Sequence, residues 1–135
     1  MGGASSRRVP TTDLQDRTGR FALAVLAFCR LLPDTPEARE AASQLRRAAN
    51  SVRSNYRAAR RGRSHAEFRA KLGVVYEEAD ECVGWLQYLA EGGIGQNAAL
   101  LQEARELTLI FARAVRTARA TALGKRRTNG GTDDR

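Results

Sequence analysis

Residues 51–86 decide the fold, and they read SVRSNYRAARRGRSHAEFRAKLGVVYEEADECVGWL. An arginine-rich helix is expected to end near Arg61, a turn follows at Gly62, and a second helix begins after Ser64. Ser64 and Glu67 match the capping box, in which the serine hydroxyl accepts from an amide of the first turn and the glutamate reaches back. Because the turn is short, the two helices are predicted to pack antiparallel.

The rest of the chain extends this helix pair. Apolar residues recur at helical spacing in four segments, expected at about 12–32, 35–61, 64–91 and 96–123. Pro33 and Pro36 separate the first two segments, and a glycine-rich stretch, GGIG, separates the last two. Three short connections predict an all-α, antiparallel up-down-up-down four-helix bundle that forms a single domain.

Both ends of the chain differ in composition from these four segments. Residues 1–11 are rich in Gly, Ser and Arg, and residues 124–135 read GKRRTNGGTDDR. Neither stretch contains enough apolar side chains to bury against the bundle. We therefore expect a disordered N-terminal tail, a helical domain at 12–123 and a disordered basic C-terminal tail.

The apolar positions predict more contacts than one bundle provides. The first helix is apolar on nearly all sides, and the third carries a second apolar strip beside its main stripe. A helix in a monomeric bundle leaves one side exposed to water, so these extra positions predict self-association. For Trp85, the alternative to a contact with another copy is that its side chain packs across its own helix. The predicted oligomer interface consists of Leu23, Leu26, Leu31, Val74, Trp85 and Tyr88.

The net charge of +8 favours a polyanionic partner, because arginine side chains bind phosphate with two parallel hydrogen bonds. Only Lys71 and Lys125 are lysines, so 21 of the 23 basic residues are arginine. Eight of these arginines fall between residues 36 and 63, most of them within a sector of about 60° on the second helix. The residues predicted to bind nucleic acid are Arg39, Arg46, Arg47, Arg53, Arg57, Arg60, Arg61 and Arg63.

An alternative interpretation assigns the same arginines to the protein itself. The third helix is acidic, with six carboxylates against Arg69 and Lys71. Opposite charges on neighbouring helices form weak surface ion pairs, which would neutralise the arginines without any ligand. Because no aromatic side chain other than Tyr56 lies near the row, and Tyr56 is predicted to pack in the core, any RNA or DNA binding is expected to be non-specific or shape-based.

The sequence offers little for catalysis. His65 has no nucleophile or orienting acid beside it, and the carboxylates of residues 77–81 lack the Glu-x-x-His signature of di-metal bundles. We therefore expect no enzyme activity, no cofactor and no metal, with metal binding by the 77–81 cluster as a remaining hypothesis. Cys29 and Cys82 lie on apolar faces and are expected to be free thiols. With no membrane-spanning or signal segment, a cytoplasmic location without a membrane partner is predicted.

Several spaced motifs in the central helices resemble one bacterial family. They are RRAANSVxxNY at 46–56, AxRxxSxxEFxxKL at 59–72, EAxE at 78–81 and WL at 85–86. They resemble the four-helix-bundle proteins encoded in intervening sequences of 23S ribosomal RNA genes. The resemblance extends over residues 17–120 and implies the same fold.

The same superfamily includes the accessory variability determinant of diversity-generating retroelements, a basic pentameric barrel that binds a reverse transcriptase and nucleic acid. This similarity implies a homopentamer here, with RNA or DNA and a reverse transcriptase as partners. The leading hypothesis is a non-enzymatic, oligomeric, basic helix bundle that binds nucleic acid. The alternative is a protein-interaction scaffold whose charges serve assembly, with no direct nucleic-acid role.

Overall fold

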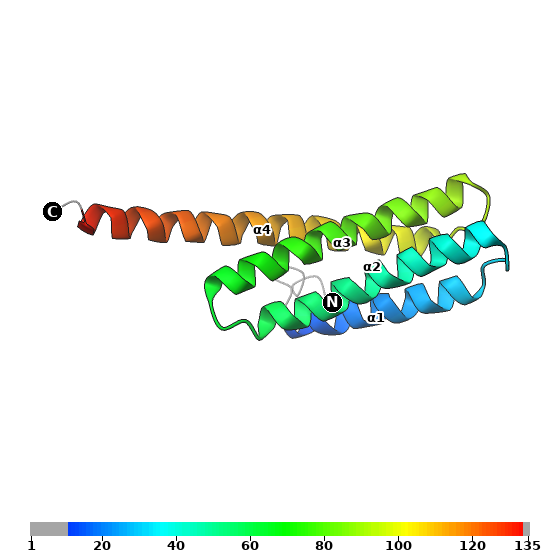
Figure 1. Ribbon diagram of the computed structural model, residues 1–135, viewed down its shortest axis with the longest axis horizontal. Coiled ribbons are helices and arrows are strands. Elements are labelled where there is room, and N and C mark those ends of the chain that lie inside the picture. Colours follow the sequence, from blue (N-terminus) through cyan, green and yellow to red (C-terminus); the bar gives the residue numbers. More distant parts are fainter. Residues whose placement is uncertain (1–10, 134–135) are drawn as a thin grey trace, which may run out of the picture.

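The computed structural model describes the backbone of residues 11–133 and the side chains of residues 14–124. This part of the chain forms four helices and no strand, and their bounds are α1 (Thr11–Arg30), α2 (Pro36–Arg60), α3 (His65–Glu91) and α4 (Ala98–Asp133). Each helix packs on the next one in the chain, with the largest interface between α2 and α3 and the smallest between α1 and α4 (Figure 1). The prediction of an all-α four-helix bundle is confirmed.

Side chains cap the starts of α2 and α3, and the sequence predicts the cap at Ser64. The Thr35 hydroxyl accepts a hydrogen bond from the Ala38 amide at 3.3 Å, and the Ser64 hydroxyl accepts one from the Glu67 amide at 3.1 Å. Each bond satisfies a backbone donor that has no partner inside the helix. The two caps therefore set where the chain reverses direction.

The connection between α3 and α4 also depends on local chemistry. Gly93 has a φ of +69°, a left-handed conformation that glycine adopts without a steric penalty. The Asn97 side chain then accepts from the Leu100 amide at 3.0 Å and caps α4. The sequence analysis placed this start at about residue 96 and did not identify Asn97 as the cap.

The buried core follows the predicted apolar stripes. Its centre joins α2 to α4, where the Tyr56 and Phe111 rings lie 5.5 Å apart. Tyr56 is buried, as the sequence analysis predicted. Alanine lines much of the buried face of α2, and so the neighbouring helices approach α2 closely. The largest fully buried apolar side chains are Phe111, Leu45, Leu72, Leu89, Leu107, Val25, Val52 and Val75.

Two further features of the core are polar or titratable. Thr18 is completely buried, and its hydroxyl donates to the Leu14 carbonyl oxygen at 2.8 Å, so no unpaired polar group results. Cys29 and Cys82 are both buried and free, as predicted. Burial raises the pKa of the Cys82 thiol from an ordinary value of 9.0 to about 12.

The raised pKa of Cys82 predicts a loss of stability in alkali. Below about pH 9 the thiol keeps its proton in the folded and the unfolded chain, whereas between pH 9 and 12 the unfolded chain loses it first. We expect the free energy of unfolding to fall over this interval by at most about 4 kcal/mol, at about 1.4 kcal/mol per pH unit. Urea unfolding from pH 8 upwards should show a shallower fall for Cys82→Ala than for the parent protein or for Cys29→Ala. Equal slopes in all three proteins would contradict this assignment.

The C-terminal end of the chain is helical where the sequence predicts disorder, and almost all of the predicted N-terminal tail lies outside the described residues. The predicted N-terminal tail, residues 1–11, lies outside the described residues except for Thr11, where α1 begins. The predicted disordered C-terminal tail, 124–135, is instead helical through Asp133. Figure 1 shows α4 continuing past the ends of the other helices. No proline follows Leu123 to block the backbone hydrogen bonds, whereas Gly124, Gly130 and Gly131 each lower helix propensity by about 1 kcal/mol. None of the described helices is long and apolar enough to cross a membrane.

Candidate nucleic-acid interface

Basic side chains gather where α2 turns into α3. The last turns of α2, the connecting turn and the first turns of α3 enclose an open hollow of about 700 Å³. Among the residues whose side chains the structure describes, no aromatic one lines this hollow, and Glu67 is the single carboxylate that does. We call its five cationic side chains the basic groove: Arg53, Arg57, Arg61, Arg63 and Lys71.

The helical repeat and the antiparallel turn together assemble the basic groove. Arg53, Arg57 and Arg61 follow one another at four-residue spacing and so share one face at the end of α2. The tight turn at Gly62 brings the start of α3 beside that face, and with it Lys71. All five cations are exposed, and none of them forms an ion pair within the described part of the chain.

A smaller hollow of about 280 Å³ adjoins the same arginines on the side of α1. Arg20 lines it together with Arg53 and Arg57, and Asp16 contributes one carboxylate. The Arg53 side chain lies against Gly19, where an added Cβ would be 3.7 Å from the Arg53 Nε. Arg53 and Arg57 therefore line both hollows.

Sequence reasoning did not identify Lys71 or Arg20 as binding residues. Lys71 belongs to the acidic third helix and Arg20 to the mainly apolar first helix, so neither stood out from its own segment. Only the packing of α1 and α3 on either side of α2 brings them to the arginine row.

Two of the eight predicted arginines are already paired inside the protein. Arg47 lies 3.1 Å from a Glu78 carboxylate oxygen and also contacts Glu81, so it engages in the pairing between α2 and α3 that the alternative interpretation predicts. The hydrogen bond to Glu78 is the largest cause of the raised pKa of Arg47. Arg39 pairs with Asp34 at 2.6 Å at the other end of α2. The pair of Arg39 with Asp34 is solvent-exposed and that of Arg47 is partly buried at Glu78, and both reduce the charge available to a ligand.

The other two arginines lie away from the basic groove. Arg46 is half-buried on the side of α2 that faces α1. Burial raises the pKa of the Cys29 thiol there, and the charge of Arg46 partly opposes this rise. Arg60 is exposed and lies near Tyr56. Burial raises the pKa of the Tyr56 side chain. The structure thus divides the predicted row, with four of its eight arginines in the basic groove.

The predicted interface residues on α1, and Leu31 directly after it, differ in exposure. Leu23 is 60% exposed and Leu31 is 85% exposed, whereas Leu26 is half-buried. On α4, Leu109 and Leu123 are each 59% exposed and were missed by the sequence analysis. Large apolar side chains at such exposures remain available to a partner, and the homo-oligomer stays a prediction.

The predicted interface residues on α3 occupy two separate places. Val74 lines a small hollow against α4 beside Arg69 and Arg119. Trp85 and Tyr88 line a different, acidic cleft between α3 and the start of α2. The six predicted residues therefore do not form one continuous apolar patch.

The residues considered for catalysis have structural contacts. The His65 Nε2 lies 3.2 Å from the Ala118 carbonyl oxygen and so joins the start of α3 to α4. Glu78 and Glu81 bind Arg47. In the part of the chain that the structure describes, no group of three or more His, Cys, Asp or Glu side chains is placed to hold a metal ion.

Comparison with known proteins agrees with this architecture. The model of the 23S rRNA-intervening sequence protein family matches residues 12–113. The chain belongs to this family. The matched range contains the whole basic groove and ends within α4, before the extension seen in Figure 1. The predicted relation to the intervening-sequence family is confirmed, and the relation to the accessory variability determinant stays a prediction.

A crystal structure of a protein from Bacteroides thetaiotaomicron VPI-5482 shares the fold of this chain. It is described as a protein of unknown function from the S23 ribosomal protein family, and it superposes with a TM-score of 0.72 at 20% sequence identity. The alignment covers 78% of this chain and 97% of that chain. At this identity the likeness shows the fold alone. No curated protein matches the chain in sequence.

Proposed function

We propose that this protein is a non-enzymatic helix bundle that binds RNA or DNA through the sugar-phosphate backbone, using the basic groove. The observation that supports the proposal is the gathering of five cationic side chains around one hollow; within the described part of the chain they form no ion pair, and one carboxylate lines the hollow with them. A protein surface of this kind raises the local concentration of polyanions.

The geometry of the groove suits phosphates better than bases. Arg53 and Arg57 on α2 and Arg61 at its C-cap follow one another in steps of about 6 Å, so they can contact successive phosphates of one strand. Stacking on bases requires exposed aromatic rings, and none lines the groove. Binding is therefore expected to depend on charge and shape, with little preference for sequence.

Salt dependence tests this proposal directly. The full-length protein is titrated into an about 20-nucleotide labelled RNA, and separately into a duplex DNA of similar length, at salt concentrations from about 50 to 300 mM. If all five cations of the groove contact phosphates, log K should fall with log[salt] with a slope of about −3.5 for the single strand and about −4.5 for the duplex. Fluorescence anisotropy measures both slopes. Absence of binding at the lowest salt concentration, or a slope near zero, would contradict the proposal.

A second candidate function is an assembly scaffold, with its charges and exposed leucines serving contacts between copies. The exposed side chains of Leu23, Leu31 and Leu109 support it, because each leaves a large apolar side chain available for a contact between copies. The two candidates are distinguished by whether charge reversal in the basic groove removes nucleic-acid binding or assembly. A pentamer and a reverse transcriptase partner are predictions that rest on the resemblance.

A further inference from the structure

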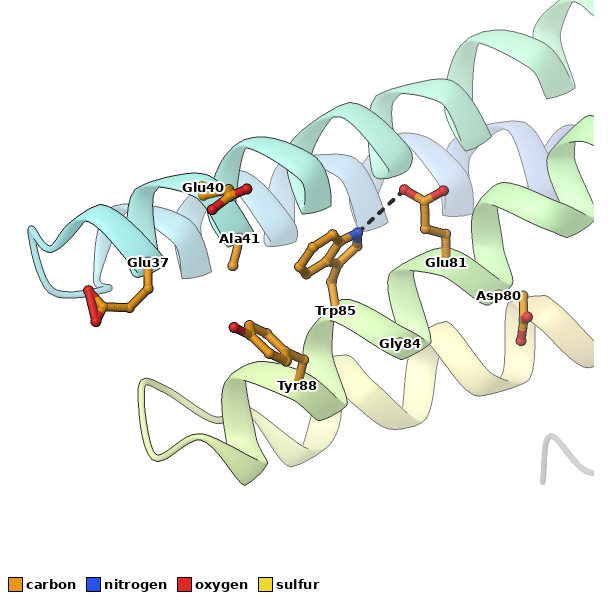
Figure 2. Close-up of a pocket in the computed structure, with 8 residues that line it drawn as sticks. All are labelled: Glu37, Glu40, Ala41, Asp80, Glu81, Gly84, Trp85 and Tyr88. Carbon is orange, nitrogen blue, oxygen red and sulfur yellow. Dashed lines mark hydrogen bonds between the residues drawn. The ribbon is translucent and has the colours of Figure 1, made fainter.

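A second open cleft lies at the opposite end of the α2–α3 interface from the basic groove, and its charge is opposite. It measures about 790 Å³ and is formed by the start of α2 and the second half of α3 (Figure 2). Four carboxylates and two aromatic rings line it, and among residues 14–124 no basic side chain does. We call this site the acidic cleft: Glu37, Glu40, Asp80, Glu81, Trp85 and Tyr88.

Two small residues leave the space open. Ala41 on α2 and Gly84 on α3 line the cleft, and a Cβ added to Gly84 would meet no atom within 4 Å. Figure 2 shows the Trp85 and Tyr88 rings projecting from α3 toward the start of α2. The cleft is therefore an accessible site bordered by aromatic rings.

The two rings are oriented by contacts that a ligand does not need to break. They lie edge to face, with centroids 5.6 Å apart and planes at 89°. The Trp85 indole N–H donates to Glu81 at 3.4 Å, and Tyr88 is 52% exposed. A lysine ammonium or arginine guanidinium above the face of such a ring is attracted by the ring quadrupole.

The carboxylates of the cleft are mostly available to a cation. Glu81 is the member that pairs with Arg47, whereas Glu37, Glu40 and Asp80 form no ion pair in the described part of the chain. Hydrogen bonds from its own backbone amide and from Thr35 lower the pKa of Glu37, so this carboxyl remains ionised at neutral pH. The result is a negative site on a protein whose net charge is +8.

We propose that the acidic cleft binds a peptide segment rich in arginine or lysine from another protein. One cationic side chain would lie against the Trp85 and Tyr88 rings, and the carboxylates would pair with its neighbours. The volume lies within the range of sites that take small ligands or a few peptide side chains. Charged residues are depleted at the cores of permanent interfaces between copies, so a site with four carboxylates suits an exchangeable partner better than a second copy of this chain.

The protein contains its own reporter for this test, since Trp85 is its only tryptophan. The full-length protein is titrated with the peptide Ac-GRRRG-NH₂, and separately with the same peptide containing citrulline in place of each arginine. Citrulline keeps the shape of arginine and removes its charge. We expect a saturable change in Trp85 fluorescence with the arginine peptide and an at least tenfold weaker response, about 1.4 kcal/mol, with the citrulline peptide.

Two variants that lose carboxylates at different places on the protein test where the peptide binds. The exposed pair Glu40→Gln and Asp80→Asn should weaken arginine-peptide binding at least tenfold, or about 1.4 kcal/mol. The control Asp16→Asn removes an exposed carboxylate at the distant start of α1 and should change the affinity less than about twofold. Circular dichroism confirms that each variant remains helical.

Three results would overturn the proposal. The first is equal binding of the two peptides to the unmodified protein, and the second is unchanged affinity in the Glu40→Gln, Asp80→Asn variant. The third is a Trp85 signal that changes with protein concentration in the absence of peptide and disappears in that variant. This last result would show that a second copy occupies the cleft. None of these results depends on the basic groove, so nucleic-acid binding can hold or fail independently.

Discussion

Reversing the charges of Arg53 and Arg57 is expected to weaken nucleic-acid binding at least a hundredfold at moderate salt. These two side chains line both hollows of the basic surface, and the double change to glutamate turns two positive charges into two negative ones. The groove would then hold as many carboxylates as cations. Loss of two phosphate contacts together with new repulsion amounts to roughly 3 kcal/mol, and the salt slope should become shallower by about two units.

A matched variant separates the groove from the overall charge. Arg105→Glu with Arg113→Glu changes the net charge by the same amount at exposed positions of α4, outside the basic groove. Anisotropy titrations with the same RNA should show little change for this control. An equal loss in both double variants would mean that net charge, and not the groove, determines binding.

Light scattering on the same proteins distinguishes the scaffold hypothesis. If Arg53→Glu with Arg57→Glu abolishes nucleic-acid binding and leaves the particle mass unchanged, the groove is a ligand site. If the unmodified protein binds no nucleic acid and the double variant loses assembly, the arginines serve contacts between copies instead.

Truncation of Phe111 to alanine is expected to cost about 3 to 5 kcal/mol of folding free energy. Its side chain is fully buried, and its ring meets Tyr56 across the centre of the bundle. The change removes the ring and leaves a cavity that four packed helices can only partly close. Because domains of this size are stable by roughly 5 to 15 kcal/mol, a loss of this size would remove a large fraction of the total stability.

The control for this change lies two residues away on the same helix. Leu109 is 59% exposed, and Leu109→Ala should alter stability by less than about 0.5 kcal/mol in a monomer. Urea unfolding followed by circular dichroism measures both variants. A small effect of Phe111→Ala would contradict the central role of the contact between α2 and α4. A large effect of Leu109→Ala would show that this leucine is covered in an assembly.

The core and the turns were predictable because their causes lie within short stretches of sequence. Val52, Tyr56 and Leu72 lie on apolar stripes whose helical period is visible in their own segments. Ser64 caps α3 through an amide three residues away. By contrast, the C-terminal extension of α4 was missed, because its polar composition suggested disorder while nothing in it blocks helical hydrogen bonding.

The binding surfaces were only partly predictable, because each depends on more than one helix. The arginine row is visible on α2, yet the structure places Arg47 against the carboxylates of α3 and leaves Arg53 and Arg57 open. Trp85 and Tyr88 were interpreted as part of an apolar interface, and the carboxylates of α2 that share their cleft lie more than forty residues earlier in the chain.

The sequence by itself determined four helices, their antiparallel order and the residues of the core, since periodicity, caps and short connections act locally. Only the tertiary structure decided that Lys71 and Arg20 join Arg53 and Arg57, and that carboxylates from two helices surround Trp85. The physical reason is that the charge of a surface depends on which faces of neighbouring helices meet. Those contacts join residues that are distant in the chain, and no local pattern records them.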